Sequence, residues 1–137
     1  MLKKLSISLG FMIFMFGFLK FFSPFKTWYS IQIQTSGLPE VSYAFGIISE
    51  MIVGIMLMSS PFVQNEKLKL SLSRFGSLGL IGIMCVAIYV HLLPDVPGEV
   101  LPMKIKPPII PVLFLLATIY NLYLSVIPKG SLQRVKS

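Results

Sequence analysis

Glu50 is the residue whose surroundings point most directly to chemistry. It lies within the apolar run Ala44–Met58, a segment that a lipid bilayer would bury. A charged side chain at the centre of a membrane helix costs at least about 2.5–3.5 kcal/mol, so such residues usually pair with another group or serve a function. We therefore take Glu50 as a candidate catalytic residue that handles protons. The alternatives are a neutral acid, or a salt bridge that only fixes helix packing.

Two further polar residues are placed to share a pocket with Glu50. A rise of about 1.5 Å per residue puts Glu50 roughly 10–14 Å below the external start of its helix, and Lys20 and His91 lie near the external ends of theirs. A lysine stem reaches down along apolar surface, and histidine titrates near neutral pH. We predict one ligand-binding pocket open to the outside, in which Glu50 and His91 handle protons and Lys20 holds charge. Taken singly, Lys20 is also typical of an interfacial anchor and His91 of a helix end.

Small residues follow the same helix faces as these polar groups. In the second apolar segment Gly46, Glu50 and Gly54 are four residues apart, so another helix can approach closely there. The simplest interpretation is that these rows of small residues, or seams, only let helices pack closely, and for the small residues themselves we adopt it. Each of the other three segments has a comparable seam with one polar group: Gly10, Ile13, Gly17 and Lys20; Gly79, Ile83, Ala87 and His91; Ala117, Asn121 and Ser125. We add Asn121, Tyr89 and Tyr120 to the predicted ligand-binding residues, with Tyr123 as a further aromatic contact.

The elements that carry these residues are predicted to be four membrane-spanning helices. Hydrophobic residues make up 55% of the chain and charged residues only 12%, whereas a soluble domain carries about a quarter charged residues. Four apolar stretches approach the roughly 20 residues that cross about 30 Å of hydrocarbon. The sequence thus predicts an all-α membrane protein, a single domain over residues 1–137 built as a four-transmembrane-helix bundle. The spans are Leu5–Phe22, Val41–Met58, Phe75–Leu93 and Ile109–Ile127.

The distribution of basic residues predicts the orientation of the bundle. Because cytoplasmic loops carry an excess of Lys and Arg, the richer side is expected to be cytoplasmic. Both termini are then cytoplasmic, as in a multi-pass protein of the cell (inner) membrane. The net charge of +7 mostly reflects this bias, and nothing in the sequence indicates nucleic-acid binding. The richer side has Lys3, Lys4, Lys67, Lys69, Arg74, Lys129, Arg134 and Lys136, and the other has Lys20, Lys26, Lys104 and Lys106.

The connections between spans are predicted to differ. The turn 59–74 is polar and basic and is predicted to be an ordinary surface connection. In the first external loop Phe25, Trp28 and Tyr29 recur at helical spacing, so a short helix there would place an aromatic face among lipid headgroups. The second external loop, 94–108, has five prolines and is predicted to be stiff and irregular.

Several kinds of site are excluded by the residues present. Cys85 is the only cysteine, so the chain can form no internal disulfide, dithiol redox pair or cysteine-based zinc cluster. One histidine and a few distant carboxylates do not make a metal site. The sequence contains no glycine-rich phosphate loop, nucleophile elbow or catalytic triad.

The chain resembles the DoxX family of small four-helix membrane proteins. The resemblance covers about Gly10 to Ile127 and rests on short motifs, which are Gly17-Phe18-Leu19-Lys20-Phe21, Gly37-Leu38-Pro39, Glu50 followed by Val53-Gly54, and His91. The family takes its name from a membrane subunit of a thiosulfate:quinone oxidoreductase. The resemblance therefore implies a membrane redox complex and a quinone as candidate cofactor, with Lys20, Glu50 and His91 as the residues carried over. The single cysteine argues against direct thiol-disulfide exchange.

Three functional interpretations remain open at this point, and whether the chain is an enzyme is one of the open questions. The leading one is a membrane subunit of a redox system that binds a quinone-like or other amphipathic molecule. The second is a non-catalytic scaffold or assembly partner that docks another membrane protein or a further copy of itself. The third is a proton-coupled small-molecule transporter, which four spans without a visible repeat disfavour. Membrane lipid is an expected partner in each case.

Overall fold

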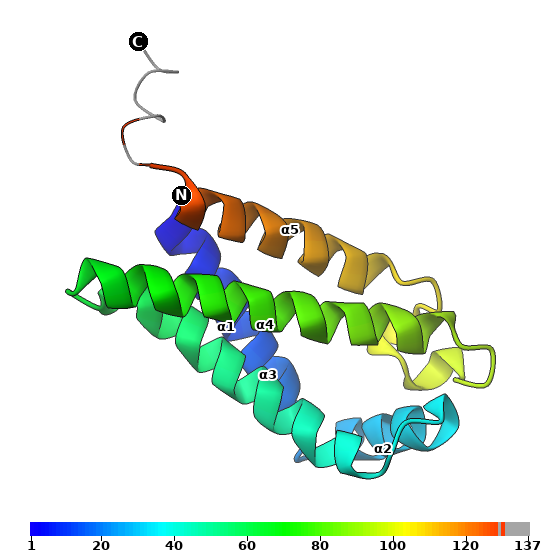
Figure 1. Cartoon of the computed structure of the whole chain (residues 1–137). Helices are drawn as coiled ribbons and strands as arrows, with labels where there is room; N and C mark the ends of the chain where they lie inside the picture. Colours follow the sequence, from blue (N-terminus) through cyan, green and yellow to red (C-terminus); the bar gives the residue numbers. More distant parts are fainter. Residues whose placement is uncertain (129, 131–137) are drawn as a thin grey trace.

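Four long helices run alongside one another, and a short fifth helix lies at one end of the bundle (Figure 1). The structure is a computed structural model that describes residues 1–128 and Gly130, and the regular secondary structure of these residues is entirely helical. Short 3-10 turns occur at Ser60–Phe62, Gly98–Val100 and Pro102–Lys104. The α-helices are α1 (Leu2–Leu19), α2 (Phe25–Ser36), α3 (Val41–Ser59), α4 (Glu66–Leu92) and α5 (Ile109–Val126).

Helices α1, α3, α4 and α5 are each long and apolar enough to cross a membrane. This confirms the predicted all-α chain with four helices of membrane-spanning length, as expected of a multi-pass membrane protein. The bounds of α1, α3 and α5 lie within three residues of the predicted spans. Large apolar side chains are exposed along all four helices, as required where lipid rather than water surrounds the bundle.

Helix α4 is longer than the sequence indicated. We predicted a span from Phe75 and a surface connection over 59–74, but α4 begins at Glu66 and the true connection is short. Asn65 explains the early start, because its side-chain oxygen accepts hydrogen bonds from the backbone N–H groups of Lys67 and Leu68. The basic residues assigned to the connection thus lie on the first turns of a continuous helix.

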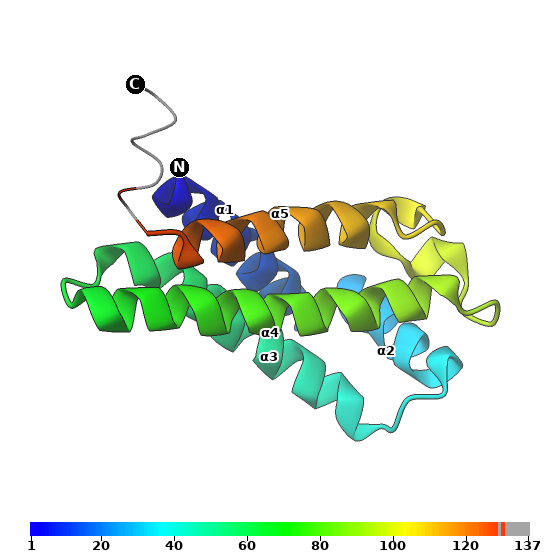
Figure 2. The same cartoon turned by 45° about the horizontal axis from the view of Figure 1, so that its top comes forward.

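The chain begins at the same end of the bundle at which α5 ends (Figures 1 and 2). The Lys3 ammonium lies 5.3 Å from the centre of the Phe62 ring, so the α3–α4 connection is at that end as well. Which side of a membrane this end faces stays a prediction from the charge count. Three of the basic residues in that count, Lys129, Arg134 and Lys136, lie outside the described residues.

Glycines let α1 and α3 pack with their backbones in close contact. A Cβ at Gly54 would lie only 2.8 Å from the Gly10 carbonyl oxygen. Further along, a Cβ at Gly17 would lie 3.0 Å from the Glu50 Cβ. The predicted seams of these two helices therefore do face each other, and they bring Lys20, directly after α1, next to Glu50.

A buried polar network joins α1, α4 and α5 near the end where the chain begins. The Ser6 hydroxyl donates to Asn121 Oδ1 at 2.9 Å, and Asn121 Nδ2 donates to the Ser77 hydroxyl oxygen at 2.9 Å. Arg74 donates through its guanidinium to the Ser125 carbonyl oxygen at 2.9 Å. Within an apolar bundle such bonds fix which helix faces meet.

At the opposite end, α2 and the proline-rich loop 94–108 pack on each other. Val96, Val100 and Leu101 of the loop are buried in a cluster with Val90, and Trp28 of α2 packs against this cluster. The Gln32 side-chain amide donates to the Val100 carbonyl oxygen, and Lys106 donates to the Val96 carbonyl oxygen at 2.6 Å. The loop is irregular, as its prolines indicated, but it is well anchored.

The aromatic residues of α2 do not form the single headgroup-facing surface that we predicted. Phe25 is exposed, whereas the Tyr29 side chain is buried between α2 and the rest of the bundle. The prediction of a short helix was correct, but the assignment of Tyr29 to a headgroup-facing surface was wrong. Helical spacing places Phe25 and Tyr29 on one side, and the chain turns that side partly towards α3, so Tyr29 becomes part of the interior.

Candidate functional site

A cavity of about 700 Å³ lies between α3 and α4, in the half of the bundle nearest α2. Its walls come from all five α-helices and the proline-rich loop, and they are largely apolar. Ile13, Val53, Met84 and Phe114 form part of these walls and belong to the main hydrophobic core. The polar residues that also line the cavity are Lys20, Tyr29, Gln32, Ser42, Ser49, Glu50 and His91.

Lys20 and Glu50 form an ion pair in the wall of this cavity. Lys20 Nζ donates to both carboxylate oxygens of Glu50, at 2.7 and 2.8 Å. The two side chains are only 18% and 10% exposed. Bidentate contact at this distance between poorly hydrated groups is a charge-assisted hydrogen bond rather than a loose surface pair. The close approach of α1 and α3 is what makes the contact possible.

Tyr29 covers the other side of the lysine head. Lys20 Nζ lies 4.0 Å from the centre of the Tyr29 ring, and the Tyr29 hydroxyl donates to the Ser42 carbonyl oxygen at 3.2 Å. A cation over an aromatic face gains about 0.5–2 kcal/mol, more when water is excluded. Burial, and secondly the charge of Glu50, raise the pKa of Tyr29 above its ordinary value, so the phenol stays protonated. The ammonium is thus held between a carboxylate and an aromatic ring.

His91 lines the same cavity but lies at a different depth from the ion pair. A Cβ at Gly79 of α4 would lie 2.7 Å from Val53 of α3, so these two positions are opposite each other. Because α3 and α4 are antiparallel, Glu50 is level with Gly82. His91 follows nine residues later, about 13 Å farther along the axis. The His91 Nδ1–H donates to the Ala87 carbonyl oxygen at 2.8 Å, which leaves Nε2 as the nitrogen available to a ligand.

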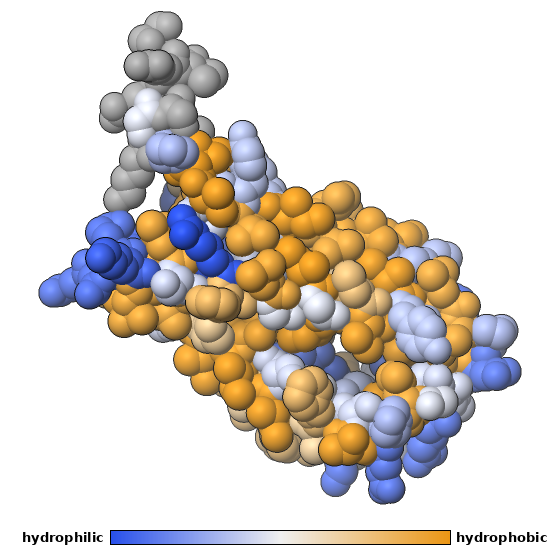
Figure 3. All heavy atoms as spheres, in the orientation of Figure 1, coloured by the Kyte–Doolittle hydropathy of each residue, from blue (hydrophilic) through white to orange (hydrophobic). Residues whose placement is uncertain are grey.

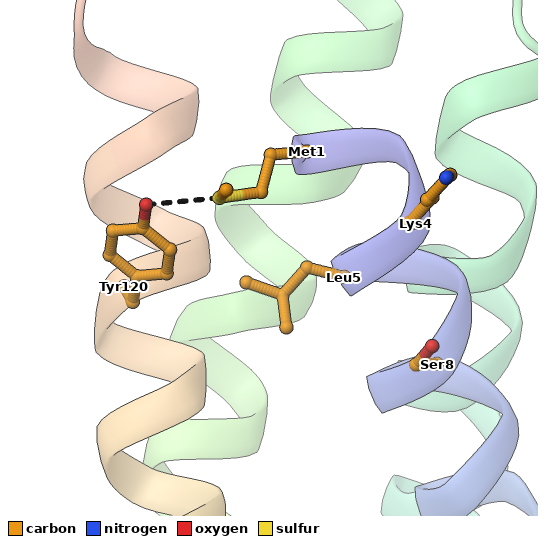
Figure 4. A pocket seen from close by; sticks show the side chains of 5 residues that line it. All are labelled: Met1, Lys4, Leu5, Ser8 and Tyr120. Atoms are coloured by element: carbon orange, nitrogen blue, oxygen red, sulfur yellow. Dashed lines mark hydrogen bonds between the residues drawn. The ribbon is translucent and has the colours of Figure 1, made fainter.

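Three residues that we predicted to join the ligand site do not line this cavity. Tyr89 is 51% exposed on the outer face of α4. Tyr120 lies near the start of the chain, where its hydroxyl donates to the Met1 sulfur at 3.0 Å (Figure 4). The Asn121 side chain is hydrogen-bonded to Ser6 and Ser77 in the buried polar network. Shared helical spacing does not give depth, and α5 runs in the direction that carries Tyr120 and Asn121 away from Lys20. A role of these three residues in ligand binding stays a prediction that this cavity does not support.

Several lining residues were missed by reasoning from the sequence. Ser49 and Ser42 precede Glu50 on α3, and Gln32 lies one turn beyond Tyr29 on α2. Tyr29 and Gln32 are three residues apart, so once Tyr29 faces the bundle, Gln32 is expected on the same face of α2. Nothing in the sequence indicated that Gly82 lines the cavity, because this depends on the empty space around it in the folded chain.

The described residues contain no group of three or more His, Cys, Asp or Glu side chains that could hold a metal ion. Cys85 is exposed on α4 and is not among the residues that line the cavity. The side chains that line the site supply hydrogen bonds, charge and two groups, Glu50 and His91, that can exchange protons.

Comparisons of the chain with protein families, with curated proteins and with solved structures found no match. The resemblance to the DoxX family accordingly stays a prediction from the motifs. What is established is a helical chain with four helices able to span a membrane and a mainly apolar cavity lined by a buried ion pair.

Proposed function

We propose that this protein binds an amphipathic molecule, drawn from the membrane, in the cavity between α3 and α4. The proposal rests on one combination: a cavity of about 700 Å³ with largely apolar walls, and an ion pair, shielded from solvent, that lines it. Ligand cavities of about 300–1,000 Å³ with few, well-placed polar groups are typical binding sites. Val53, Met84 and Phe114 would contact the apolar part of the ligand, and Glu50 its polar part.

The redox role is the more specific form of this proposal. In it, the protein is a DoxX-like subunit of a membrane redox system in the cell (inner) membrane, and the bound molecule is a quinone. Two points support it. The motif residues Lys20, Glu50 and His91 all line one cavity, and Glu50 and His91 are groups that can exchange protons. They lie at two depths, so a proton passing between them would need the ligand or water as an intermediary.

The proposal is tested by purifying the protein in mild detergent from its native host and extracting what it retains. We expect a stoichiometric amphipathic molecule, identified by mass spectrometry of the extract, and a quinone if the redox form is right. A matched preparation of the Ser49→Phe variant, in which a large side chain occupies the cavity, should lack it. Recovery of only bulk lipid in both preparations would contradict the proposal.

A second candidate function is a membrane scaffold, and one observation favours it. The Lys20 ammonium contacts both the Glu50 carboxylate and the Tyr29 ring, as expected of a group that holds α1 against α3 and α2. A scaffold would retain a stoichiometric membrane protein, not a small molecule, in the same mild-detergent purification. It would also keep that partner in the Ser49→Phe variant, because Ser49 lines the cavity and the substitution leaves the other lipid-facing side chains unchanged.

A further inference from the structure

The cavity reaches the lipid-facing surface of the bundle. Phe45, Ile52 and Val86 line it, yet they are 71%, 52% and 51% exposed. A residue can do both only where the cavity wall opens outward. Figure 3 shows the corresponding hollow between α3 and α4, with hydrophilic atoms at its base and a rim that is partly hydrophobic and partly of intermediate hydropathy. The opening therefore lies on the flank of the bundle, where acyl chains would surround it.

Gly82 lies at this opening and is level with the ion pair. It lines the cavity, and a Cβ placed on it would meet nothing within 4 Å. The absent side chain is thus not required for helix packing, unlike at Gly54, where a Cβ would collide with α1. Gly82 keeps the space beside Glu50 open to the flank.

At the end of the cavity nearest α2, contacts tie α2 to the proline-rich loop. The hydrogen bond from Gln32 to the Val100 carbonyl oxygen ties α2 to the proline-rich loop, and Trp28 packs into the cluster that contains Val100. Lys106 fastens the same loop to the carbonyl oxygen of Leu93 at the end of α4. A molecule that arrives from water would have to separate these contacts, whereas one dissolved in the bilayer would not.

The ion pair also restricts the polar group of the ligand. Lys20 Nζ donates to both oxygens of the Glu50 carboxylate and lies over the Tyr29 ring, so the charge of the ammonium is already balanced within the site. The carboxylate accepts these two bonds but offers about four acceptor positions. The pair is neutral as a whole and retains acceptor capacity, which suits an uncharged head that donates a hydrogen bond. A second negative charge beside Glu50 would be repelled.

Building on the proposed function, we infer that the ligand is an uncharged, hydroxyl-bearing amphipathic molecule that enters from the bilayer between α3 and α4, past Gly82. The inference thus names the substrate class of the site, its source and the residue that controls access. It predicts that the hydroxyl lies against Glu50 and that the apolar chain runs along Val53 and Met84.

The head-group part is tested with two photoactivatable probes that share their acyl chain and glycerol and differ by one phosphate group, which adds negative charge. Proteoliposomes are mixed with vesicles that contain either a monoacylglycerol with a diazirine in its acyl chain or the corresponding lysophosphatidic acid. We expect cross-links on Val53 and Met84, with a yield at least about tenfold higher for the monoacylglycerol, equivalent to about 1.4 kcal/mol. Equal yields would overturn the inferred head group. If neither probe reacted within the cavity, the proposed function itself would fail.

The access part is tested by the initial rate of cross-linking with the monoacylglycerol probe. Gly82→Phe should slow the reaction several-fold. Leu78→Phe, an equally bulky change at a lipid-exposed position of α4 outside the cavity, should not. Lys106→Met, which removes the bonds that anchor the loop and does not line the cavity, should also leave the rate unchanged. Acceleration by Lys106→Met together with no effect of Gly82→Phe would show access from water and overturn the inference. Circular dichroism of each variant verifies that the bundle is folded.

Discussion

The coupling between Lys20 and Glu50 can be measured by a double-mutant cycle. Glu50→Gln leaves the ammonium without its counter-charge, and Lys20→Met leaves the carboxylate without its donor. The two groups are 2.7 and 2.8 Å apart and are largely shielded from solvent. Each single change therefore leaves a poorly hydrated charge, whereas the double change leaves two neutral side chains.

The expected size of the effect follows from the burial of the pair. Two charges about 4 Å apart at an effective dielectric constant of about 20 interact by about 4 kcal/mol, and desolvation offsets part of this gain. Breaking a buried pair typically costs about 3–5 kcal/mol. Because Lys20 keeps 18% exposure, we expect the lower end, about 3 kcal/mol for each single variant. The double variant leaves no unpaired charge, so its loss should be well below the sum of about 6 kcal/mol and no larger than that of either single variant.

Unfolding in mixed micelles, followed by the fluorescence of the single tryptophan, Trp28, provides the assay. Trp28 is next to Tyr29, which contacts the Lys20 head, so the signal reports on this end of the bundle. The control cycle pairs Glu50→Gln with Asn121→Leu, which share no partner and should be additive within about 0.5 kcal/mol. Strictly additive losses for Lys20 and Glu50 would refute the reasoning that the pair acts as one buried unit.

Three further outcomes are expected. Gly54→Leu should cost more than about 1–3 kcal/mol, because its Cβ would lie against the backbone of α1, whereas Gly82→Leu should change the free energy of unfolding little; equal losses in a denaturation experiment would contradict the close packing. Cys85→Ala should alter stability by at most about 0.5 kcal/mol, since the thiol is exposed on α4 and the chain holds no second cysteine; loss of ligand retention in a folded variant would reveal an unrecognised role. In a Cys85→Ala background, Gln34→Cys should react with an impermeant thiol reagent on intact cells and Gln64→Cys only after lysis; the reverse pattern would invert the orientation.

The sequence indicated the helices and the ion pair well, because both depend on local patterns. Four apolar runs of the right length leave few alternatives to four helices, and a carboxylate within such a run needs a partner at a similar depth. Lys20 met that condition, and the seams of α1 and α3 specified the contact. The same reasoning predicted the pocket near Lys20 and Glu50.

Depth and direction across helices were harder to predict. Tyr120 and Asn121 share a small-residue seam with the correct spacing, but register between α4 and α5 is set by side-chain contacts that no single helix encodes. Helix α4 begins early because Asn65 caps it. We interpreted the basic residues that follow Asn65 as a surface connection, so the cap was missed. The importance of Gly82 required knowledge of the empty space around it.

The most direct test of a membrane-derived ligand is the intact mass of the protein released from mild detergent. The wild-type protein should carry one non-covalent adduct of constant mass. Ser49→Phe, which projects a ring into the cavity, should lose the adduct, and Ile48→Phe, its lipid-exposed neighbour outside the cavity, should keep it. Loss of the adduct from both variants, or a wild-type protein without any adduct, would contradict the assignment of this cavity as a binding site.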